Sequence, residues 1–310
     1  MNKTAWPEGK QFAFTVFDDP DGQTESHSRL IYKFLADVGF RTTKGVWPLA
    51  PRRAPNSLGD TCEGNPSYLS HCVELQRAGF EMVYHCASPQ DSTRGEVIES
   101  LDRFKDYFGH DPATMANHYN QDAIYWGPAR VTGAQRLIYQ ALTRGSTRNR
   151  FFGHVEGHPS FWGDICRERI RYCRNLVFAG INTLSCCPQM PYYDAERPYV
   201  QAWYCSVEGN QLPAFLKAIS ESNQDRLLEE SGSAILYTHF GLGFVENGRL
   251  NSRFVQLMTR LSHLNGWFVP VGILLDYLTA KKGGLTVITP SERAALERRW
   301  LLEKVFRGTS

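Results

Sequence analysis

Short apolar runs alternate with amphipathic segments along most of this chain. Residues 12–17 (FAFTVF) are apolar apart from one threonine and show no polar alternation, which is typical of a strand buried on both faces of a parallel sheet. Residues 27–38 place their apolar side chains at helical spacing and end at Gly39. Residues 41–47 are the next strand candidate. A strand, a helix and a strand in this order predict a βαβ unit.

The alternation continues without an internal repeat or a low-complexity linker, so one architecture must account for the 310 residues. The series predicts an α/β fold formed by a single parallel β/α barrel, with an open doubly wound sheet as the alternative. No glycine-rich phosphate loop follows the first strand, which weakens the alternative. Further strands are predicted at residues 80–85, 113–118, 181–187, 201–207, 234–239 and 267–271. Further helices are predicted at residues 66–78, 92–108, 134–142 and 166–176, within residues 213–230, and at residues 254–264 and 273–279.

The end of the chain has its own helix signal. Thr289-Pro-Ser-Glu292 is a capping box with proline in the first helical position. We therefore expect a barrel over residues 1–285 and a C-terminal helix within residues 286–310. Its apolar stripe predicts packing against the barrel, with a docking surface for a partner as the alternative.

Composition adds only broad limits. The chain is 42% hydrophobic and 13% aromatic, enough for a large core, and its 34 basic and 32 acidic residues predict neither a nucleic-acid partner nor an anionic membrane surface. The first ten residues carry no leader-like apolar segment, and no stretch reaches the length of a membrane span. We therefore expect a cytoplasmic protein whose eight cysteines remain thiols.

Chemistry-bearing residues follow several of the predicted strands. Asp18 and Asp19 end the first strand, and His85, His118 and His239 end three others. Taken singly, each is explained by a turn or a hydrogen-bonded structural histidine. Because parallel barrels build their sites at the carboxyl ends of different strands, the set together predicts one site. A carboxylate and two imidazoles suit a divalent cation, leaving a second carboxylate as base and a further histidine as acid for hydrolysis of an amide or ester.

These residues also carry a resemblance to a known family. Residues 14–22 (FTVFDDPDG) resemble the first motif of the polysaccharide deacetylases (carbohydrate esterase family four and relatives). Residues 79–85 resemble the strand and first histidine of the second motif, residues 235–239 the last motif, and residues 266–275 the closing strand and helix. The likeness spans about two thirds of the chain. It implies a deformed barrel of about seven strands that removes an acyl group from an amino sugar with the help of a metal.

The resemblance also implies roles for individual residues. It makes Asp18 the general base, Asp19 and His85 metal ligands, and His239 the acid that protonates the leaving group. The second motif departs from the family pattern, because proline stands at position 89 where another histidine is expected. The third motif is replaced by residues 116–120 (ANHYN), and we expect His118 to supply the missing ligand.

Residues 119–164 form an irregular region rich in aromatic residues, which ends with residues 153–164 (GHVEGHPSFWGD). Aromatic faces and carboxylates suit the C–H faces and hydroxyls of sugars, so this region predicts a substrate-binding cleft, with a structural loop on the barrel rim as the alternative. The candidate substrate-binding residues are Trp126, His154, Glu156, His158 and Trp162.

The sequence therefore predicts a metal-dependent hydrolase that cleaves a non-peptide C–N bond in an N-acylated amino sugar or glycan precursor. Zinc is the expected metal, although imidazole and carboxylate ligands also accept cobalt, nickel, manganese or iron. Two alternatives remain open: a catalytically silent barrel that binds a glycan or a partner protein, and an amidohydrolase acting on a non-sugar amide.

Overall fold

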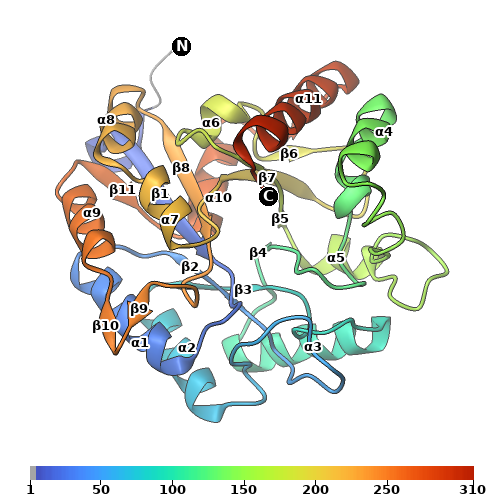
Figure 1. The fold of residues 1–310 in the computed structure, drawn as a ribbon, viewed down its shortest axis with the longest axis horizontal. Helices are drawn as coiled ribbons and strands as arrows, with labels where there is room; N and C mark the ends of the chain where they lie inside the picture. The colour runs from blue at the N-terminus through green and yellow to red at the C-terminus, as the bar shows by residue number, and fades with distance from the viewer. Residues whose placement is uncertain (1–4) are drawn as a thin grey trace.

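The computed structural model describes residues 5–310, and its centre is a closed barrel of parallel strands (Figure 1). Successive strands pair in parallel around the ring, and β8 closes it by pairing with both β1 and β7. This confirms the predicted single β/α barrel with seven strands. The barrel strands are β1 (Phe12–Asp18), β2 (Thr43–Val46), β3 (Glu81–Tyr84), β4 (Thr114–Met115), β5 (Tyr172–Phe178), β7 (Ala202–Val207) and β8 (Ser233–Thr238).

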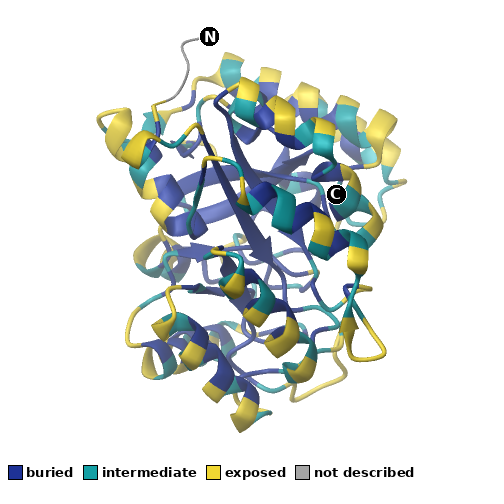
Figure 2. Ribbon diagram, turned by 90° about the vertical axis from the view of Figure 1, so that its left-hand side faces the viewer, coloured by how far each residue is buried: buried dark blue, intermediate teal, exposed yellow. Residues whose placement is uncertain are grey.

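Helices surround the barrel, and their buried sides face the strands (Figures 1 and 2). They are α1 (Glu25–Asp37), α2 (Pro66–Arg77), α3 (Arg94–Phe108), α4 (Gly133–Leu142), α5 (Gly163–Arg169), α6 (Thr183–Cys186), α7 (Leu212–Ala218), α8 (Glu221–Glu229), α9 (Ser252–Ser262), α10 (Val271–Lys281) and α11 (Pro290–Arg307), with short 3₁₀ turns η1 (Pro7–Gly9) and η2 (Gly127–Arg130). The remaining strands are β6 (Tyr192–Tyr193), β9 (Val245–Glu246), β10 (Arg249–Leu250), β11 (Gly266–Phe268) and β12 (Thr286–Val287).

Every residue of β1 is buried, as its unbroken apolar pattern predicts. Side chains alternate between the two faces of a strand. Phe14 and Val16 pack in the same apolar cluster as Ile31 of α1. Phe17 points into the barrel, where its ring lies 6.5 Å from that of Tyr204 on β7, two strands away around the ring. This alternation decides where the carboxylates at the end of β1 point.

Two elements differ from the sequence prediction. Residues 166–176, expected to be helical, contain the end of α5 and most of β5, because the buried polar residues Arg174 and Asn175 break the apolar pattern typical of a buried strand. Residues 181–187, expected to be a strand, contain the four-residue helix α6, whose first turn is capped by the Asn182 side chain accepting from Ser185 N.

The C-terminal helix α11 begins with the predicted capping box and packs on the barrel. Leu296, Trp300 and Leu301 are buried, and the Trp300 ring stacks on Tyr139 of α4, so α4 and α11 lie side by side (Figure 1). Val305, the last residue of the predicted stripe, is 52% exposed. All eight cysteines are free and buried. Within residues 5–310, no helix combines the length and the apolar composition needed to cross a membrane.

Candidate functional site

The carboxyl ends of the strands surround a cavity of about 190 Å³. The loops after β1, β3, β4 and β8 each contribute polar side chains, and β5 contributes one from inside the barrel. The chain's last residue also lies on its wall, and the C-terminus sits over the barrel in Figure 1. The lining residues are Asp19, Asp21, His85, Asn117, His118, Tyr119, Trp126, Arg174, Val177, Tyr237, His239 and Ser310.

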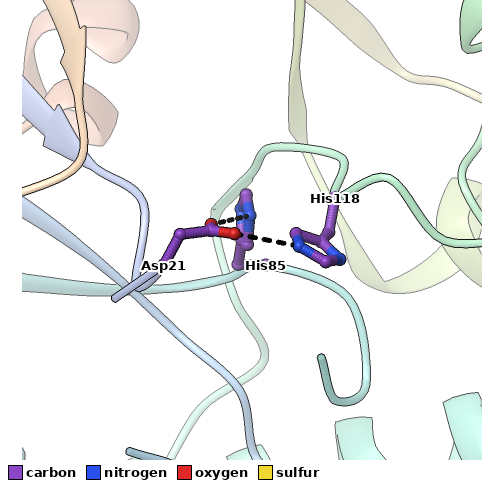
Figure 3. Close-up of side chains that lie close together, drawn as sticks. All are labelled: Asp21, His85 and His118. Atoms are coloured by element: carbon purple, nitrogen blue, oxygen red, sulfur yellow. Dashed lines mark hydrogen bonds and ion pairs between the residues drawn. The ribbon is translucent and has the colours of Figure 1, made fainter. Parts of the chain in front are cut away.

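Three of these residues form a compact ligand set (Figure 3). Asp21, His85 and His118 each offer one atom, and these atoms lie within 4.8 Å of one another. Asp21 Oδ1 is 3.0 Å from His118 Nε2, and Asp21 Oδ2 is 3.4 Å from His85 Nε2. Asp21 Oδ2 and His85 Nδ1 are buried without a hydrogen-bond partner among residues 5–310. Two imidazoles and a carboxylate with unused buried atoms fit a divalent cation such as zinc.

A buried amide fixes the orientation of the His118 ring. Asn120 donates from Nδ2 to the carbonyl of Ser88, which leaves its Oδ1 facing His118 Nδ1 at 2.8 Å. Because an amide oxygen only accepts, His118 carries its proton on Nδ1 and presents Nε2 to Asp21. Such support from a second residue is the usual way in which proteins fix the tautomer of a ligating histidine.

The charges of the cluster support one another. Burial alone would raise the pKa of Asp21, but its interactions with the His118 and His85 rings outweigh burial and lower it well below its ordinary range. Burial likewise opposes the charged form of His118, yet in that form Nε2 also carries a proton and donates to Asp21, and this hydrogen bond raises the pKa of His118 above its ordinary value. Asp21 is therefore an anion held between two imidazoles.

Asp19 lies beside this cluster and is held by an arginine. Arg174 donates from Nη1 and Nη2 to the two carboxylate oxygens, at 3.0 and 2.5 Å. Asp19 Oδ1 is 3.6 Å from His85 Nδ1, and both partners of the Arg174 pair are almost completely buried. A carboxylate fixed in this way at a cavity wall can accept a proton or orient a water molecule.

His239 faces Asp19 across the cavity. Its Nδ1 donates to the carbonyl of Asn210 at 2.7 Å, because a carbonyl only accepts. Nε2 then points into the cavity, 3.9 Å from Asp19 Oδ2 and 3.7 Å from Asp21 Oδ2. The anchored ring can therefore exchange a proton at Nε2 alone.

Asp18 lies outside the cavity, on the opposite face of β1. Its carboxylate accepts hydrogen bonds from Tyr32 Oη at 2.8 Å, Gln23 Nε2 at 2.9 Å and the backbone N–H of Phe240 at 2.9 Å, and Lys44 Nζ is 3.7 Å away. Burial raises the pKa of Asp18, and the Lys44 charge only partly offsets it. In this position the Asp18 carboxylate has no access to a substrate in the cavity, which the general-base role expected from the sequence requires.

Close packing brings the strand ends together. A side chain at Gly45 of β2 would place its Cβ 2.9 Å from the Asp18 carbonyl oxygen and 3.5 Å from His85 Cβ. Glycine at this position therefore allows the ends of β1 and β3 to lie close to β2. Cys86, directly after His85, has a positive φ of 63°, a strained conformation for this residue, and its sulfur accepts from the His118 backbone N–H at 3.3 Å. The strained Cys86 lies in the turn that places the His85 side chain next to His118.

The expected substrate-binding residues separate into three groups. Trp126 lines the cavity, whereas His154 lines a neighbouring hollow that shares Trp126, and the His154 ring lies 4.5 Å from that of Tyr125. Glu156 accepts from Tyr199, and His158 stacks on Phe152, and neither residue lines the cavity. Trp162 is fully buried and donates to the Asp122 carbonyl, which rules out substrate contact by this side chain.

Among the residues not predicted from the sequence, three bind or orient the charged groups of the site. Asp21 follows Asp19 by two positions, and the Asp-Pro-Asp pattern was a usable signal, since proline starts a turn that can bring the second carboxylate back. Asn120 lies two residues after His118 and could have been found as a companion to a ligand. Arg174 had no local signal, because it lies in a strand that was predicted to be helical.

Comparison with known proteins adds evidence on the fold. No family model matches the sequence, and no curated protein sequence matches it significantly. A candidate polysaccharide deacetylase from Mycobacterium smegmatis aligns with a TM-score of 0.51 at 13% identity, covering 93% of this chain and 96% of that one. Puue allantoinase aligns with a TM-score of 0.52 at 12% identity, covering 90% and 94%. The likeness is one of fold, and it agrees with the motif resemblance in the sequence.

Proposed function

We propose that this protein is a metal-dependent hydrolase of the deacetylase kind, acting on an N-acylated amino sugar or glycan precursor. The observation that carries the proposal is the joint presence in one cavity of the Asp21, His85 and His118 ligand set, the Arg174-bound Asp19 and the anchored His239. The fold shared with a candidate polysaccharide deacetylase supports it. The motif resemblance points to the same chemistry.

Each residue has a proposed role. Asp21, His85 and His118 would hold the divalent cation, with zinc preferred, and a cation bound there would supply Lewis-acid polarisation of an acyl carbonyl. Asp19 takes the proton from the attacking water, and Arg174 keeps its carboxylate aimed at the cavity.

His239 completes the proposed reaction. Its Nε2 gives a proton to the departing amine, while the bond to Asn210 keeps the ring in place. Trp126, Tyr119 and Tyr237 offer aromatic surface for the sugar ring. Compared with the roles expected from the sequence, the base moves from Asp18 to Asp19, and the carboxylate ligand from Asp19 to Asp21.

Bound metal per chain in four proteins tests this assignment. We expect near-stoichiometric metal in the wild type and in Asp18→Asn, which is the matched control outside the cavity. Asp21→Asn should lose the metal, whereas Asp19→Asn should keep it and lose acetate release from N-acetylated amino sugars. Loss of metal in Asp19→Asn with retention in Asp21→Asn would restore the sequence-based assignment.

The same assay separates the alternatives. No metal in the wild type after reconstitution, together with no acetate release, would favour a catalytically silent barrel that binds a glycan or a partner protein. Metal with hydrolysis of allantoin but not of N-acetylated sugars would favour an amidohydrolase for a non-sugar amide, the activity named for one protein of similar fold. We also propose a reducing, cytoplasmic setting, supported by the eight free buried cysteines.

A further inference from the structure

Exposed apolar side chains gather on two neighbouring helices. The exposed large hydrophobic residues of the described chain number thirteen, and six of them lie on α4 and α11. On α4, Leu137, Ile138 and Leu142 are 69%, 51% and 48% exposed. On the last turns of α11 they are Leu302, Val305 and Phe306. Phe306 lines a separate hollow beside α7 and α8, so the three side chains on α4 are considered by themselves. Since exposed apolar patches are uncommon on monomeric proteins, these three indicate a contact surface.

Helix α4 exposes most of its apolar side chains. Of its ten residues only Tyr139 is buried, and that ring packs on Trp300 of α11. Leu137, Ile138 and Leu142 therefore contribute little to the core of the protein, and their apolar surface faces outward. We call α4 with the loop that follows it, residues 133–148, the basic docking segment.

The charge of this region is one-sided. Residues 123–155 contain five arginines and no Asp or Glu, although the whole chain carries a formal charge of +2, so the rest of the chain has a net charge of −3. Arg130 is buried, and Arg150 is paired with Asp91. The other three, Arg136, Arg144 and Arg148, are exposed and form no ion pair among residues 5–310. Overall balance therefore conceals a local positive surface, which the composition alone did not predict.

A hollow within the same region adds a place for a polar headgroup. It measures about 190 Å³, and residues 126–155 alone line it. Arg136 and Arg148 lie at this hollow with the Phe151 and Phe152 rings, and Trp126 forms a wall shared with the candidate active site. Cationic groups beside aromatic and apolar surface are the features that bind anionic lipid headgroups.

We propose that the basic docking segment binds peripherally to an anionic lipid surface, with Leu137, Ile138 and Leu142 entering the interface and Arg136, Arg144 and Arg148 contacting the headgroups. Charge complementarity favours an anionic lipid surface as the partner, because arginines surround the apolar side chains. Amphipathic basic helices bind anionic membranes through both apolar burial and electrostatic attraction. Because Trp126 lines both this hollow and the cavity of the candidate site, docking would set the mouth of the barrel beside the membrane. The proposal requires neither metal nor activity.

Co-sedimentation with vesicles tests the proposal on the full chain. We expect binding to vesicles of phosphatidylcholine and phosphatidylglycerol at low salt, and little binding to phosphatidylcholine alone or at high salt. Arg144→Glu should weaken binding at least about fivefold, the contribution of one basic residue at an anionic surface. Ile138→Ser should weaken it roughly tenfold through the lost apolar contact.

Two matched variants control for general effects. Ile273→Ser replaces an isoleucine of equal exposure, 51%, beside the amino end of β3, and Arg77→Glu reverses an exposed charge on α2. Both should bind vesicles like the wild type. Absence of binding to the anionic vesicles, or equal losses in test and control variants, would overturn the proposal. So would a dimer in solution that Ile138→Ser dissociates, since a second copy would then cover the face.

Discussion

Arg174 and Asp19 are 155 positions apart in the sequence and form a two-point hydrogen-bonded ion pair inside the barrel, with distances of 3.0 and 2.5 Å. Each side chain is only 3% exposed. The pair joins the middle of β5 to the end of β1 and faces the cavity that also contains Asp21, His85 and His118. This ion pair, more than any sequence motif, distinguishes Asp19 from the adjacent Asp18.

Replacing Arg174 tests the role of this pair. We expect Arg174→Met to lower kcat/KM by about 100-fold or more, because Asp19 loses its orientation. It should also lower the free energy of unfolding by about 3–5 kcal/mol, since Asp19 remains as a buried charge without its partner. Arg174→Lys should recover part of the stability but little activity, because an ammonium group cannot make the two-point contact. Full activity in Arg174→Met would remove the positioning role.

Removing Asn120 should act on the metal through His118. Asn120→Ala takes away the oxygen that orients His118 Nδ1, so we expect metal affinity to fall about 10–100-fold while the barrel stays folded. Competition with a chelator measures the change. Asn182→Ala is the control, because this amide caps α6, away from the cavity, and should affect stability alone. Equal metal affinities in the two variants would contradict the assignment.

Two tryptophans should give opposite phenotypes. Trp126 lines the cavity, with the Arg130 guanidinium 3.0 Å from its ring centroid, so Trp126→Ala should raise KM about tenfold and change kcat less. Trp162→Phe should leave KM unchanged and lower the Tm, because it loses the hydrogen bond to Asp122. Steady-state kinetics and thermal unfolding of both variants make the comparison. A raised KM in Trp162→Phe would contradict its placement in the core.

Asp122 should make stability depend on pH. Burial raises its pKa to about 7 from an ordinary value of 3.8; the Ser92 N–H donates to Oδ1, whereas Oδ2 is buried without a hydrogen-bond partner among the described residues. Between about pH 4 and pH 7 the unfolded chain releases this proton while the folded chain keeps it. The free energy of unfolding should therefore fall as the pH rises through this range, by up to about 4 kcal/mol.

Urea unfolding at a series of pH values measures this effect. In Asp122→Asn the decline should shrink by the contribution of this one group, because the amide does not titrate. Asp37→Asn, on the exposed surface of α1, should keep the decline of the wild type. Parallel curves for the wild type and Asp122→Asn would show that Asp122 ionises equally in both states.

Much of the fold could be predicted because its signals are local. The apolar run of β1, the helical spacing in α1 and the capping box of α11 each lie within a few turns of chain, and the structure contains all three. β5 was missed because Arg174 and Asn175 interrupt its apolar pattern, and the residues that bury them come from other parts of the chain. A polar residue in a strand can be assigned to a core only when its partners are known.

The sequence by itself determined the alternation of strands and helices, and it placed His85, His118 and His239 at strand ends that meet at one mouth. Only the tertiary structure decided which aspartate does what. Side chains alternate along β1, and the backbone N–H of Asp19 still pairs with Thr238, so Asp18 turns outward and Asp19 inward. The turn after Pro20 then returns Asp21 to the two histidines. Two adjacent aspartates cannot be told apart by their sequence alone. Asp18 bonds Tyr32 and Asp19 bonds Arg174, and these contacts form only in the folded barrel.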